Sequence, residues 1–445
     1  MSKKLVQIGF DDIDSPFGGC TTHFASIIVE KLSQKWNVVW VDYPNLIRLN
    51  PGIPYRTRGN GAVALRFSID TDKVKLIIPL IERAIHEYIE EDYPNTNPGV
   101  VLFDSQVPKD ILDLSRLALW RVVPIQLARR VIEKNKIAHY SSGNGRGLVG
   151  ALSAVANTLS RDHTYEYIAY RKLEQSGNER GVDVGSVFAM DRSMRDRVFS
   201  NIDQSTKRIM IEPHGPDPVL YGVRGETAED VIEASTQIKS EQSVDRWTVF
   251  RTNQGTGEHL THRVVVRNVR PYMAAVVQGK VDSRPRMIEG GHCIFSISDD
   301  TGKIDCAAYE PSGEFRDIVM KLIIGDQIKI HASVRPAAKK HGLTLNIEGL
   351  EVVALTKATL VSNPVCPQCG KRMKSAGHGK GYKCGNCGYR NSVVEKTVST
   401  IERNLRRGLY LPPIRAQRHL TKPAARLGKV NDGVPIQLIP KWHNP

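Results

Sequence analysis

The stretches Cys366-Pro-Gln-Cys369-Gly370 and Cys384-Gly-Asn-Cys387-Gly388 are the most informative part of this sequence. Fourteen residues separate the two Cys-x-x-Cys pairs, a spacing typical of a zinc ribbon, in which four thiolates surround one tetrahedral ion. Because four protein ligands leave no position open to water, we expect structural zinc rather than a catalytic centre. The alternative, two unrelated redox pairs or disulfides, fits this spacing less well.

Positive charge is concentrated in and after these cysteines. The chain has a formal net charge of +15, and its last 80 residues contain 16 Lys and Arg against 3 Asp and Glu. Such a charge density favours a large anionic partner, and nucleic-acid phosphates are the commonest one. Lys371 and Arg372 beside the first pair are candidate RNA contacts. From Val394 onward, a solvated, disordered basic tail is an equally good interpretation.

Length and composition indicate a protein of roughly three or four domains. The 445 residues are 40% hydrophobic, and no apolar run approaches the roughly 18 residues that span a membrane. The N-terminus enters a predicted strand at once, without a signal peptide. Cys20, Cys293 and Cys306 are isolated, which fits free thiols in a reducing compartment. The sequence therefore predicts a cytoplasmic protein without a membrane partner.

An α/β unit is predicted for residues 1–140. Leu5–Phe10 alternates apolar and polar residues as a strand does, and a helix should begin near Thr21. Further strands are predicted near 38–41, 62–69 and 100–103, with a helix across 74–89. Alternating strands and helices of this kind favour a layered α/β domain.

Three carboxylates, those of Asp11, Asp12 and Asp14, follow the first predicted strand. The end of a strand in an α/β sheet is the usual ligand crevice. A divalent cation would relieve their mutual repulsion, and magnesium with nucleotide phosphates is the natural guest. Gly18 and Gly19 would let backbone amides approach those phosphates at the start of the helix. The alternative is an acidic, solvated turn.

Two other glycine-containing segments are candidate phosphate contacts. Arg58 lies in a basic loop that either clamps an anion or forms an ordinary hairpin turn. Gly145, Arg146 and Gly147 precede a predicted helix, and we interpret them as a loop that faces the phosphate site of the first domain. The glycine spacing there resembles a dinucleotide fingerprint, but no βαβ unit surrounds it.

Two more domains are predicted before the cysteines. Residues 141–265 combine a helix, two strands, a helix and a strand in an order that suits a ferredoxin-like fold. Residues 270–356 contain five strands with a helix between the third and fourth, which is the plan of an OB-fold. Candidate phosphate contacts on this barrel are His331, Arg335, Lys339 and Lys340.

The remaining boundaries follow from the cysteines. The zinc ribbon is predicted for residues 362–395, and a basic C-terminal extension for 396–445. The predicted fold class is therefore a multidomain α+β protein with an α/β domain, a ferredoxin-like domain, an OB-fold β-barrel and a zinc ribbon.

An ordered series of short motifs resembles the archaeal tRNA(Ile) 2-agmatinylcytidine synthetase family. It covers nearly the whole chain and comprises 9–15, 20–22, 46–51, 55–61, 97–99, 145–151, 220–226, 289–292, the two cysteine pairs and 418–423. No single motif is decisive, but the ordered set is specific. Phe10 and Ile13, which flank the carboxylates, depart from the smaller or more polar residues expected there.

The resemblance implies an enzyme that uses ATP to join agmatine to the wobble cytidine of an isoleucine tRNA with a CAU anticodon. The modified base then pairs with adenosine instead of guanosine. The resemblance also implies a kinase-like first domain with a phosphorylated threonine that matches Thr21, beside Thr22. The acidic motif of the family's ATP site matches Asp11, Asp12 and Asp14. The implied cofactors are ATP, Mg²⁺ and structural Zn²⁺.

This chemistry is physically reasonable. A phosphoryl group on the cytosine carbonyl oxygen makes that oxygen a good leaving group for the amine to displace. The base must leave its stack to react, and a carboxylate pocket should receive the guanidinium of agmatine. The alternative is a non-enzymatic protein that binds single-stranded nucleic acid through the OB-fold and the zinc ribbon. No protein partner is evident.

Overall fold

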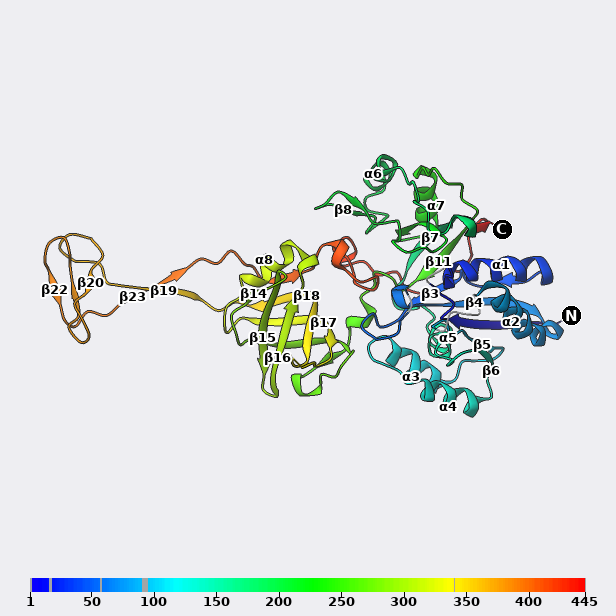
Figure 1. The fold of residues 1–445 in the computed structure, drawn as a ribbon, viewed down its shortest axis with the longest axis horizontal. Helices are drawn as coiled ribbons and strands as arrows, with labels where there is room; N and C mark the ends of the chain where they lie inside the picture. Colours follow the sequence, from blue (N-terminus) through cyan, green and yellow to red (C-terminus); the bar gives the residue numbers. More distant parts are fainter. Residues whose placement is uncertain (1, 16–17, 57, 90–94, 340, 445) are drawn as a thin grey trace.

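A computed structural model of the chain describes residues 2–15, 18–56, 58–89, 95–339 and 341–444. The molecule is elongated, with a two-layered body at one end, a β-barrel in the middle and a small cysteine-containing domain at the far end (Figure 1). In the described part of the chain, no helix is long and apolar enough to cross a membrane.

One ten-stranded sheet runs through the body, in the order β10-β7-β11-β3-β4-β1-β5-β6 with β2 and β25 beside it. These strands are β1 (Lys3–Asp11), β2 (Val39–Trp40), β3 (Asn45–Arg48), β4 (Gly61–Asp70), β5 (Gly99–Phe103), β6 (Ala138–Ser141), β7 (Thr164–Tyr170), β10 (Val219–Gly225), β11 (Arg246–Thr252) and β25 (His443–Asn444). The parallel pair β11–β3 joins the two predicted units, so that they share one sheet.

Helices cover both faces of this sheet. One layer contains α1 (Thr21–Trp36), α2 (Ile77–Tyr88), α6 (Val184–Ser193) and α7 (Ala228–Gln237), whose apolar faces share a core with β1 and β4. The other contains α3 (Lys109–Ala118), α4 (Ile125–Asn135) and α5 (Gly147–Ala156). The alternation of Val6, Ile8 and Phe10, all fully buried, points one face of β1 into the first layer.

The helix α5 packs against β1, β4 and β5 of the first unit, although the sequence places it in the second. The contact is close because glycines lie on both sides of it. A side chain at Gly9 would collide with the backbone of Ala151, and one at Gly150 would collide with the carboxylate of Asp11. The segment that contains α5 therefore rests directly behind the predicted acidic motif.

The barrel has its own core and confirms the OB-fold prediction. Its strands are β13 (Ala274–Val281), β15 (His292–Asp299), β16 (Gly302–Ala308), β17 (Gln327–Arg335) and β18 (Thr344–Ala354), with α8 (Glu314–Met320) between β16 and β17. Pairing of β13 with both β17 and β15 closes the barrel. Short strands β12 (Arg263–Val264), β14 (Arg286–Ile288) and β24 (Gly408–Tyr410) extend the same sheet.

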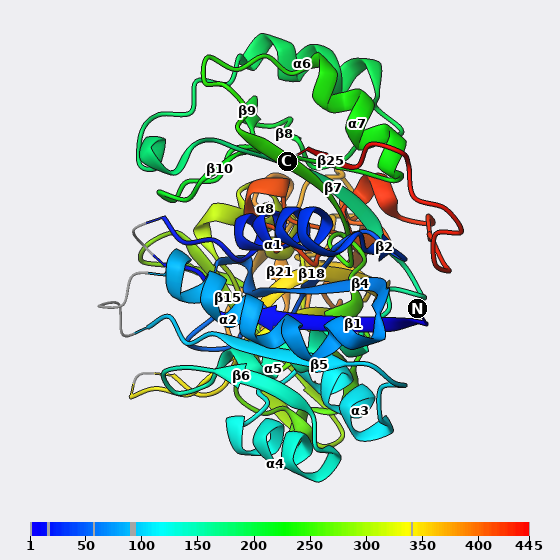
Figure 2. The ribbon, with the colours of Figure 1, turned by 90° about the vertical axis from the view of Figure 1, so that its right-hand side faces the viewer.

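The C-terminal part leaves the barrel and returns. Strands β19 (Ala358–Ser362) and β23 (Thr397–Ile401) form a two-stranded arm that carries β20 (Lys374–Ser375), β21 (Tyr382–Lys383) and β22 (Arg390–Asn391). The chain then runs back past the barrel to the body, where β25 pairs with β11 (Figure 2). Trp442 is buried in the core of the body. The tail is therefore packed and not a disordered basic extension.

Candidate active site

A cavity of about 490 Å³ lies where the first unit, the second unit and the C-terminal tail meet. Three stretches of the body contribute to its wall: the start of α1, the strand β3, and the strands β7 and β10. A loop at 210–217, beyond the short hairpin of β8 (Ile202–Asp203) and β9 (Arg208–Ile209), forms another side. The tail residues that complete the wall are Ile414, Arg415, Gln417, Arg418, His419 and Thr421.

Thr21 and Asp14 form a hydroxyl–carboxylate pair at this cavity. Thr21 is the first residue of α1, and its Oγ1 donates to Oδ2 of Asp14 at 2.6 Å. Both residues line the cavity, as does Thr22. A carboxylate within hydrogen-bond reach of a hydroxyl is positioned to accept its proton when the oxygen attacks. The structure thus brings together Thr21, Thr22 and Asp14 from the predicted site.

Asp11 and Asp12 lie behind the cavity and are not part of its lining. Arg146 donates to Asp12 through Nε at 2.8 Å and Nη2 at 2.9 Å. Arg146 therefore neutralises a carboxylate, whereas the sequence predicted a phosphate contact. Gly147 packs closely against the backbone of Asp11, and Gly145 adopts a positive φ of 73° that turns the chain into α5.

Burial controls the protonation of this carboxylate pair. Burial raises the pKa of Asp11 well above its usual range, and the nearby charge of Asp12 raises it further. Burial also raises the pKa of Asp12, although Arg146 opposes the shift. Oδ1 of Asp11 is buried and has no hydrogen-bond partner among the described residues. An unpartnered, hard oxygen donor of this kind fits a Mg²⁺ ligand.

Two arginines that the sequence did not predict line the cavity opposite α1. Arg48 of β3 and Arg224 of β10 share Glu166 of β7, with N–O distances of 3.7 Å and 3.3 Å. The Oε1 of Gln254 accepts from Nε of Arg48 at 3.2 Å and fixes the guanidinium. Both arginines lie in the motifs that carry the family resemblance, which was the available signal.

The cavity also has an acidic side. Glu212 and Asp217, from the loop at 210–217, line it. Asp217 pairs with Arg180 at 3.4 Å and is almost fully buried, whereas Glu212 is half-buried and accepts from the backbone of Val182 at 3.3 Å. The cavity can therefore bind an anionic group on one side and a cationic group on another.

Other predicted phosphate contacts are only partly described. Gly18 has a positive φ of 134°, and the amide of Gly19 donates to Ser15 Oγ at 3.1 Å. Arg58 begins a 3-10 turn, Arg58–Asn60, but its side chain lies outside the described residues. The neighbouring Gly59 lines the cavity.

The predicted RNA contacts on the barrel gather towards the end of β17. His331 is half-buried, and in the described part of the chain its Nε2 has no hydrogen-bond partner. Arg335 is exposed and donates to the hydroxyl of Tyr309 at 3.1 Å, and Lys339 is exposed. Lys340 lies outside the described residues.

The four predicted zinc ligands converge at the tip of the arm. The sulfur atoms of Cys366, Cys369, Cys384 and Cys387 all lie within 4.8 Å of one another. This arrangement fits one tetrahedral zinc ion bound by four thiolates. Lys371 and Arg372 are exposed beside this cluster.

Models of protein families match four parts of the chain in order. They are the TiaS TCKD domain at residues 7–80, the TiaS FLD domain at 145–259, an OB-fold nucleic acid binding domain at 275–353 and the TiaS C-terminal zinc ribbon domain at 363–405. The 2-agmatinylcytidine synthetase TiaS from Staphylothermus marinus, named for an isoleucine tRNA, is 40% identical over 454 residues, which cover 100% of this chain and 99% of the relative. The chain belongs to the TiaS family.

Further TiaS proteins agree with this assignment. The one from Methanocaldococcus jannaschii is 39% identical and covers 94% of this chain and 98% of its own length. Among solved structures, a complex of TiaS with its isoleucine tRNA and ATP has a TM-score of 0.86 at 37% identity, covering 96% of this chain and 98% of that one. A complex of TiaS with the same tRNA, AMPCPP and agmatine has a TM-score of 0.83 at 35% identity, covering 97% and 99%.

The comparisons confirm the predicted family and the multidomain α+β fold with an OB-fold and a zinc ribbon. The TiaS domain models cover both sides of the Thr21 cavity but end at residue 405. The tail residues that complete the cavity wall, Ile414–Thr421, lie beyond all four models.

Proposed function

We propose that this chain is an ATP-dependent synthetase that joins agmatine to the wobble cytidine of the CAU-anticodon isoleucine tRNA. Relatives of nearly the same length bear the name 2-agmatinylcytidine synthetase. Solved members of the TiaS family are complexes with isoleucine tRNA and ATP, and with isoleucine tRNA, AMPCPP and agmatine. The observation that carries the proposal is the Thr21–Asp14 pair, which opens into a cavity shared by three parts of the chain.

The reaction has two bond exchanges. In the first, a phosphoryl group leaves its bridging oxygen in ATP and forms a bond with the cytosine carbonyl oxygen. In the second, the primary amine of agmatine bonds to C2 of the base, and the C2–O bond breaks. The oxygen departs with the phosphate, and the amine nitrogen releases a proton. The positive side of the cavity favours the phosphoryl group at each step.

Thr21 is our candidate phosphoryl acceptor, with Asp14 as the group that receives its proton. Their separation of 2.6 Å supports direct proton transfer. The start of α1 adds the positive end of a helix dipole at the same place. Thr22, Gly18 and Gly19 lie around this helix start and are candidate contacts for the nucleotide phosphates.

We assign Asp11 and Asp12 as candidate ligands for Mg²⁺, which would neutralise phosphate charge when bound. Asp11 has a carboxylate oxygen without a partner among the described residues, whereas Asp12 must first release Arg146. A divalent cation favours the ionised form of both carboxylates, whose pKa burial raises. Arg146, once released, would be free to contact phosphate.

Glu212 is our candidate partner for the guanidinium of agmatine, with Asp217 beside it. A carboxylate matches the fork of a guanidinium through two parallel hydrogen bonds. A solved relative that lacks its ZRD is in complex with agmatine. This supports an agmatine site in the body of the molecule rather than in the zinc ribbon.

The barrel and the zinc ribbon are the candidate tRNA-binding surfaces. His331, Arg335 and Lys339 lie along one part of the barrel, where a single-stranded loop can be held. The zinc ribbon stands at the end of its arm, far from the cavity (Figure 1). We place the protein in the cytoplasm, where its free thiols and its tRNA substrate would be found.

The direct test is incubation of the protein with ATP, agmatine and an unmodified tRNA(Ile) transcript, followed by mass analysis of the nucleosides. We expect the wobble cytidine to gain the mass of agmatine less one water. Spermidine or lysine in place of agmatine is the specificity control. A purely binding protein would leave the nucleoside unchanged while retaining tRNA, and that result would overturn the proposal.

A further inference from the structure

The C-terminal tail forms one wall of the cavity, although it follows the last of the matched domains. Two backbone hydrogen bonds fix it there: Gly255 N donates to the carbonyl of His419 at 2.8 Å, and Gly257 N to that of Leu420 at 2.7 Å. Arg415 pairs with Asp203 at 3.0 Å on the other side. The tail therefore spans from one side of the second unit to the other, with Arg418 and His419 at the cavity.

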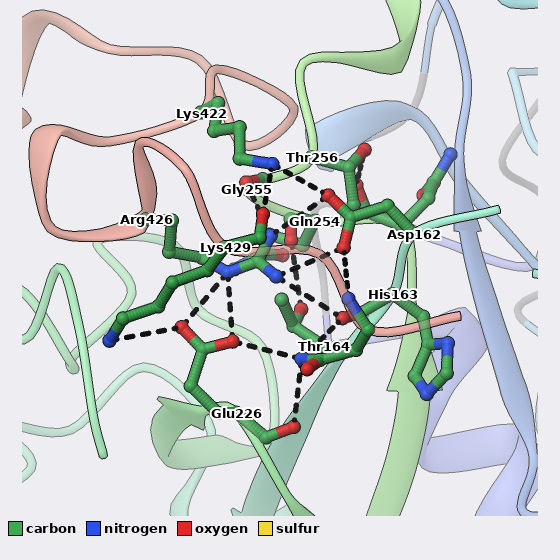
Figure 3. Close-up of polar contacts among 12 residues, drawn as sticks. Asp162, His163, Thr164, Glu226, Gln254, Gly255, Thr256, Lys422, Arg426 and Lys429 are labelled. Carbon is green, nitrogen blue, oxygen red and sulfur yellow. Dashed lines mark hydrogen bonds and ion pairs between the residues drawn. The ribbon is translucent and has the colours of Figure 1, made fainter. Parts of the chain in front are cut away.

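A buried lock holds the next turn of the tail (Figure 3). Arg426 is fully buried and pairs with Asp162 and with Glu226, each at 3.0 Å. Its Nη1 also donates to the carbonyl of Gly255 at 2.8 Å. The same short loop, 254–257, thus receives the tail at both ends and fixes its register against the cavity.

The charges at the cavity are not balanced. Arg48, Arg224 and Arg418 line one region of it, and the first two share the single carboxylate of Glu166. Among the described residues, the guanidinium of Arg418 forms no ion pair within 4.0 Å. The charge of Glu348 also reaches Arg418, but that carboxylate already binds His259 at 3.0 Å.

The side chain of His419 lies among these guanidiniums. The surrounding protein and then the charges of Arg48, Arg224 and Arg418 hold the pKa of His419 well below its usual range. Burial and then the charge of Arg418 likewise lower the pKa of Arg56, close to the same cluster. Like charges that lower one another's pKa in this way favour an anion between them.

The local backbone makes room for this cluster. Gly59, with a positive φ of 64°, has no side chain where the Arg48 guanidinium and the His419 ring approach it. A side chain at Gly61 would likewise approach Arg48 Nη1 to 2.9 Å. Both glycines line the cavity. The cluster therefore has a built site in the fold rather than a chance position on the surface.

We propose that Arg418 and His419 of the tail complete, with Arg48 and Arg224, a site for the phosphoryl group handled in the reaction. The ligand is a phosphate ester or anhydride, carried either by ATP or by the phosphorylated cytidine. The site shares its cavity with Thr21, the candidate phosphoryl acceptor. This inference rests on the proposed function and adds that the C-terminal tail is part of the active site.

The test uses the full-length protein with Arg418→Gln, Arg418→Lys and His419→Asn. The matched control is Arg130→Gln, which removes an arginine from the exposed side of α4, where the guanidinium donates to the carbonyl of Gln126. Three quantities are measured at saturating tRNA: transfer of the labelled γ-phosphate of ATP to protein and RNA, agmatine incorporation, and tRNA affinity. Thermal melting checks that each variant is folded.

Arg418→Gln should lower agmatine incorporation by about 10- to 100-fold, the factor that one charge-assisted hydrogen bond provides. Arg418→Lys should be intermediate, because lysine keeps the charge but not the fork, and His419→Asn should also lower incorporation. Arg130→Gln should stay within about twofold of wild type. If the ligand is ATP, Arg418→Gln also weakens ATP binding without tRNA. If it is the phosphorylated cytidine, ATP affinity is unchanged and agmatine transfer alone slows.

Two results would overturn the inference. The first is an Arg418→Gln protein with wild-type rates of phosphoryl transfer and agmatine incorporation. The second is a weaker tRNA affinity with wild-type rates restored at saturating tRNA, which would assign the cluster to the RNA backbone. Both presuppose an active wild-type protein, so an inactive wild type would instead count against the proposed function.

Discussion

Arg251 of β11 binds Asp42, just before β3, through two hydrogen bonds at the junction where the two halves of the ten-stranded sheet meet. Nε of Arg251 lies 3.0 Å from Oδ1 of Asp42, and the two side chains are 0% and 2% exposed. Arg251 pairs with Asn45 in the parallel register of the same junction. The pair therefore lies where the two units form one sheet, directly behind the cavity that they share.

This pair leads to a prediction about stability. Asp42→Asn would leave Arg251 buried without a counter-charge, and we expect the free energy of unfolding to fall by about 3–5 kcal/mol. Asp113→Asn, which removes the partner of the exposed Arg116, should cost less than about 1 kcal/mol. Denaturant unfolding of both variants checks this. Equal losses in the two would show that the junction pair has no special role.

A second prediction concerns Thr21 and Asp14. Thr21→Ala and Asp14→Asn should each lower agmatine incorporation by about 100-fold or more, because one removes the acceptor oxygen and the other the proton acceptor. Thr21→Ser keeps a hydroxyl and should retain most of the activity. Quantitative nucleoside analysis of the tRNA product measures the three rates. Full activity in Thr21→Ala would exclude the threonine as a phosphoryl carrier.

A third prediction concerns zinc. The cysteine cluster forms a small core of its own with Met373, separate from the cores of the barrel and the body. Removal of zinc by a chelator should therefore unfold the ribbon and weaken tRNA binding, while the main thermal transition remains. Elemental analysis should find one zinc per chain. A chelated protein with unchanged tRNA affinity would remove the ribbon from the tRNA-binding surface.

A fourth prediction concerns pH and the tail. Burial of Asp162 opposes its ionisation, but hydrogen bonds from Arg426 and Lys422 hold its pKa below the usual value. The folded state thus gains stability from this carboxylate above pH about 4, the ordinary carboxyl pKa, and loses that gain as the pH falls further. Asp162→Asn should therefore release the tail at neutral pH and matter little near pH about 3.

Hydrogen exchange of the tail checks this pH dependence. The amide of Val249 donates to the carbonyl of Trp442 at 2.8 Å, so exchange at Val249 reports whether the tail is docked. Exchange should be faster in Asp162→Asn than in wild type at neutral pH, and the difference should shrink on acidification. A difference that does not depend on pH would mean that Asp162 acts through packing and not through its charge.

Local patterns account for what the sequence predicted well. The five barrel strands, β13, β15, β16, β17 and β18, carry alternating apolar residues with turns between them, and this pattern needs no knowledge of distant residues. The cysteine spacing predicted the ribbon in the same way. The helices α3 and α4 were missed although their apolar residues have helical spacing, for example Ile111, Leu114 and Ala118.

Contacts between distant residues could not be predicted from local patterns. The strand β3 has only four residues, too few for a periodic signal, and it joins the two units only through its parallel partner. Arg426 and Asp162 are 264 positions apart, and nothing near either residue indicates the other. The tail therefore looked like a solvated basic segment, although Trp442 near its end was a sign that it returns to a core.

The site shows the same division. The sequence predicted Thr21, Asp14 and the acidic motif around them, because these residues are close together in the chain. It did not place Arg48, Arg224 and Arg418 in one cavity, since three distant segments bring them there. It also assigned Arg146 to phosphate, whereas the fold pairs it with Asp12.

Whether phosphoryl transfer takes place at the Thr21 cavity is best decided by a structure of this protein with Mg²⁺, tRNA and a non-hydrolysable ATP analogue. We expect the terminal phosphate to lie in this cavity, within hydrogen-bond reach of Thr21 and of the arginines opposite it. We also expect the wobble cytidine out of its stack in the same cavity. A triphosphate bound elsewhere, with the Thr21–Asp14 pair facing only solvent, would contradict this assignment.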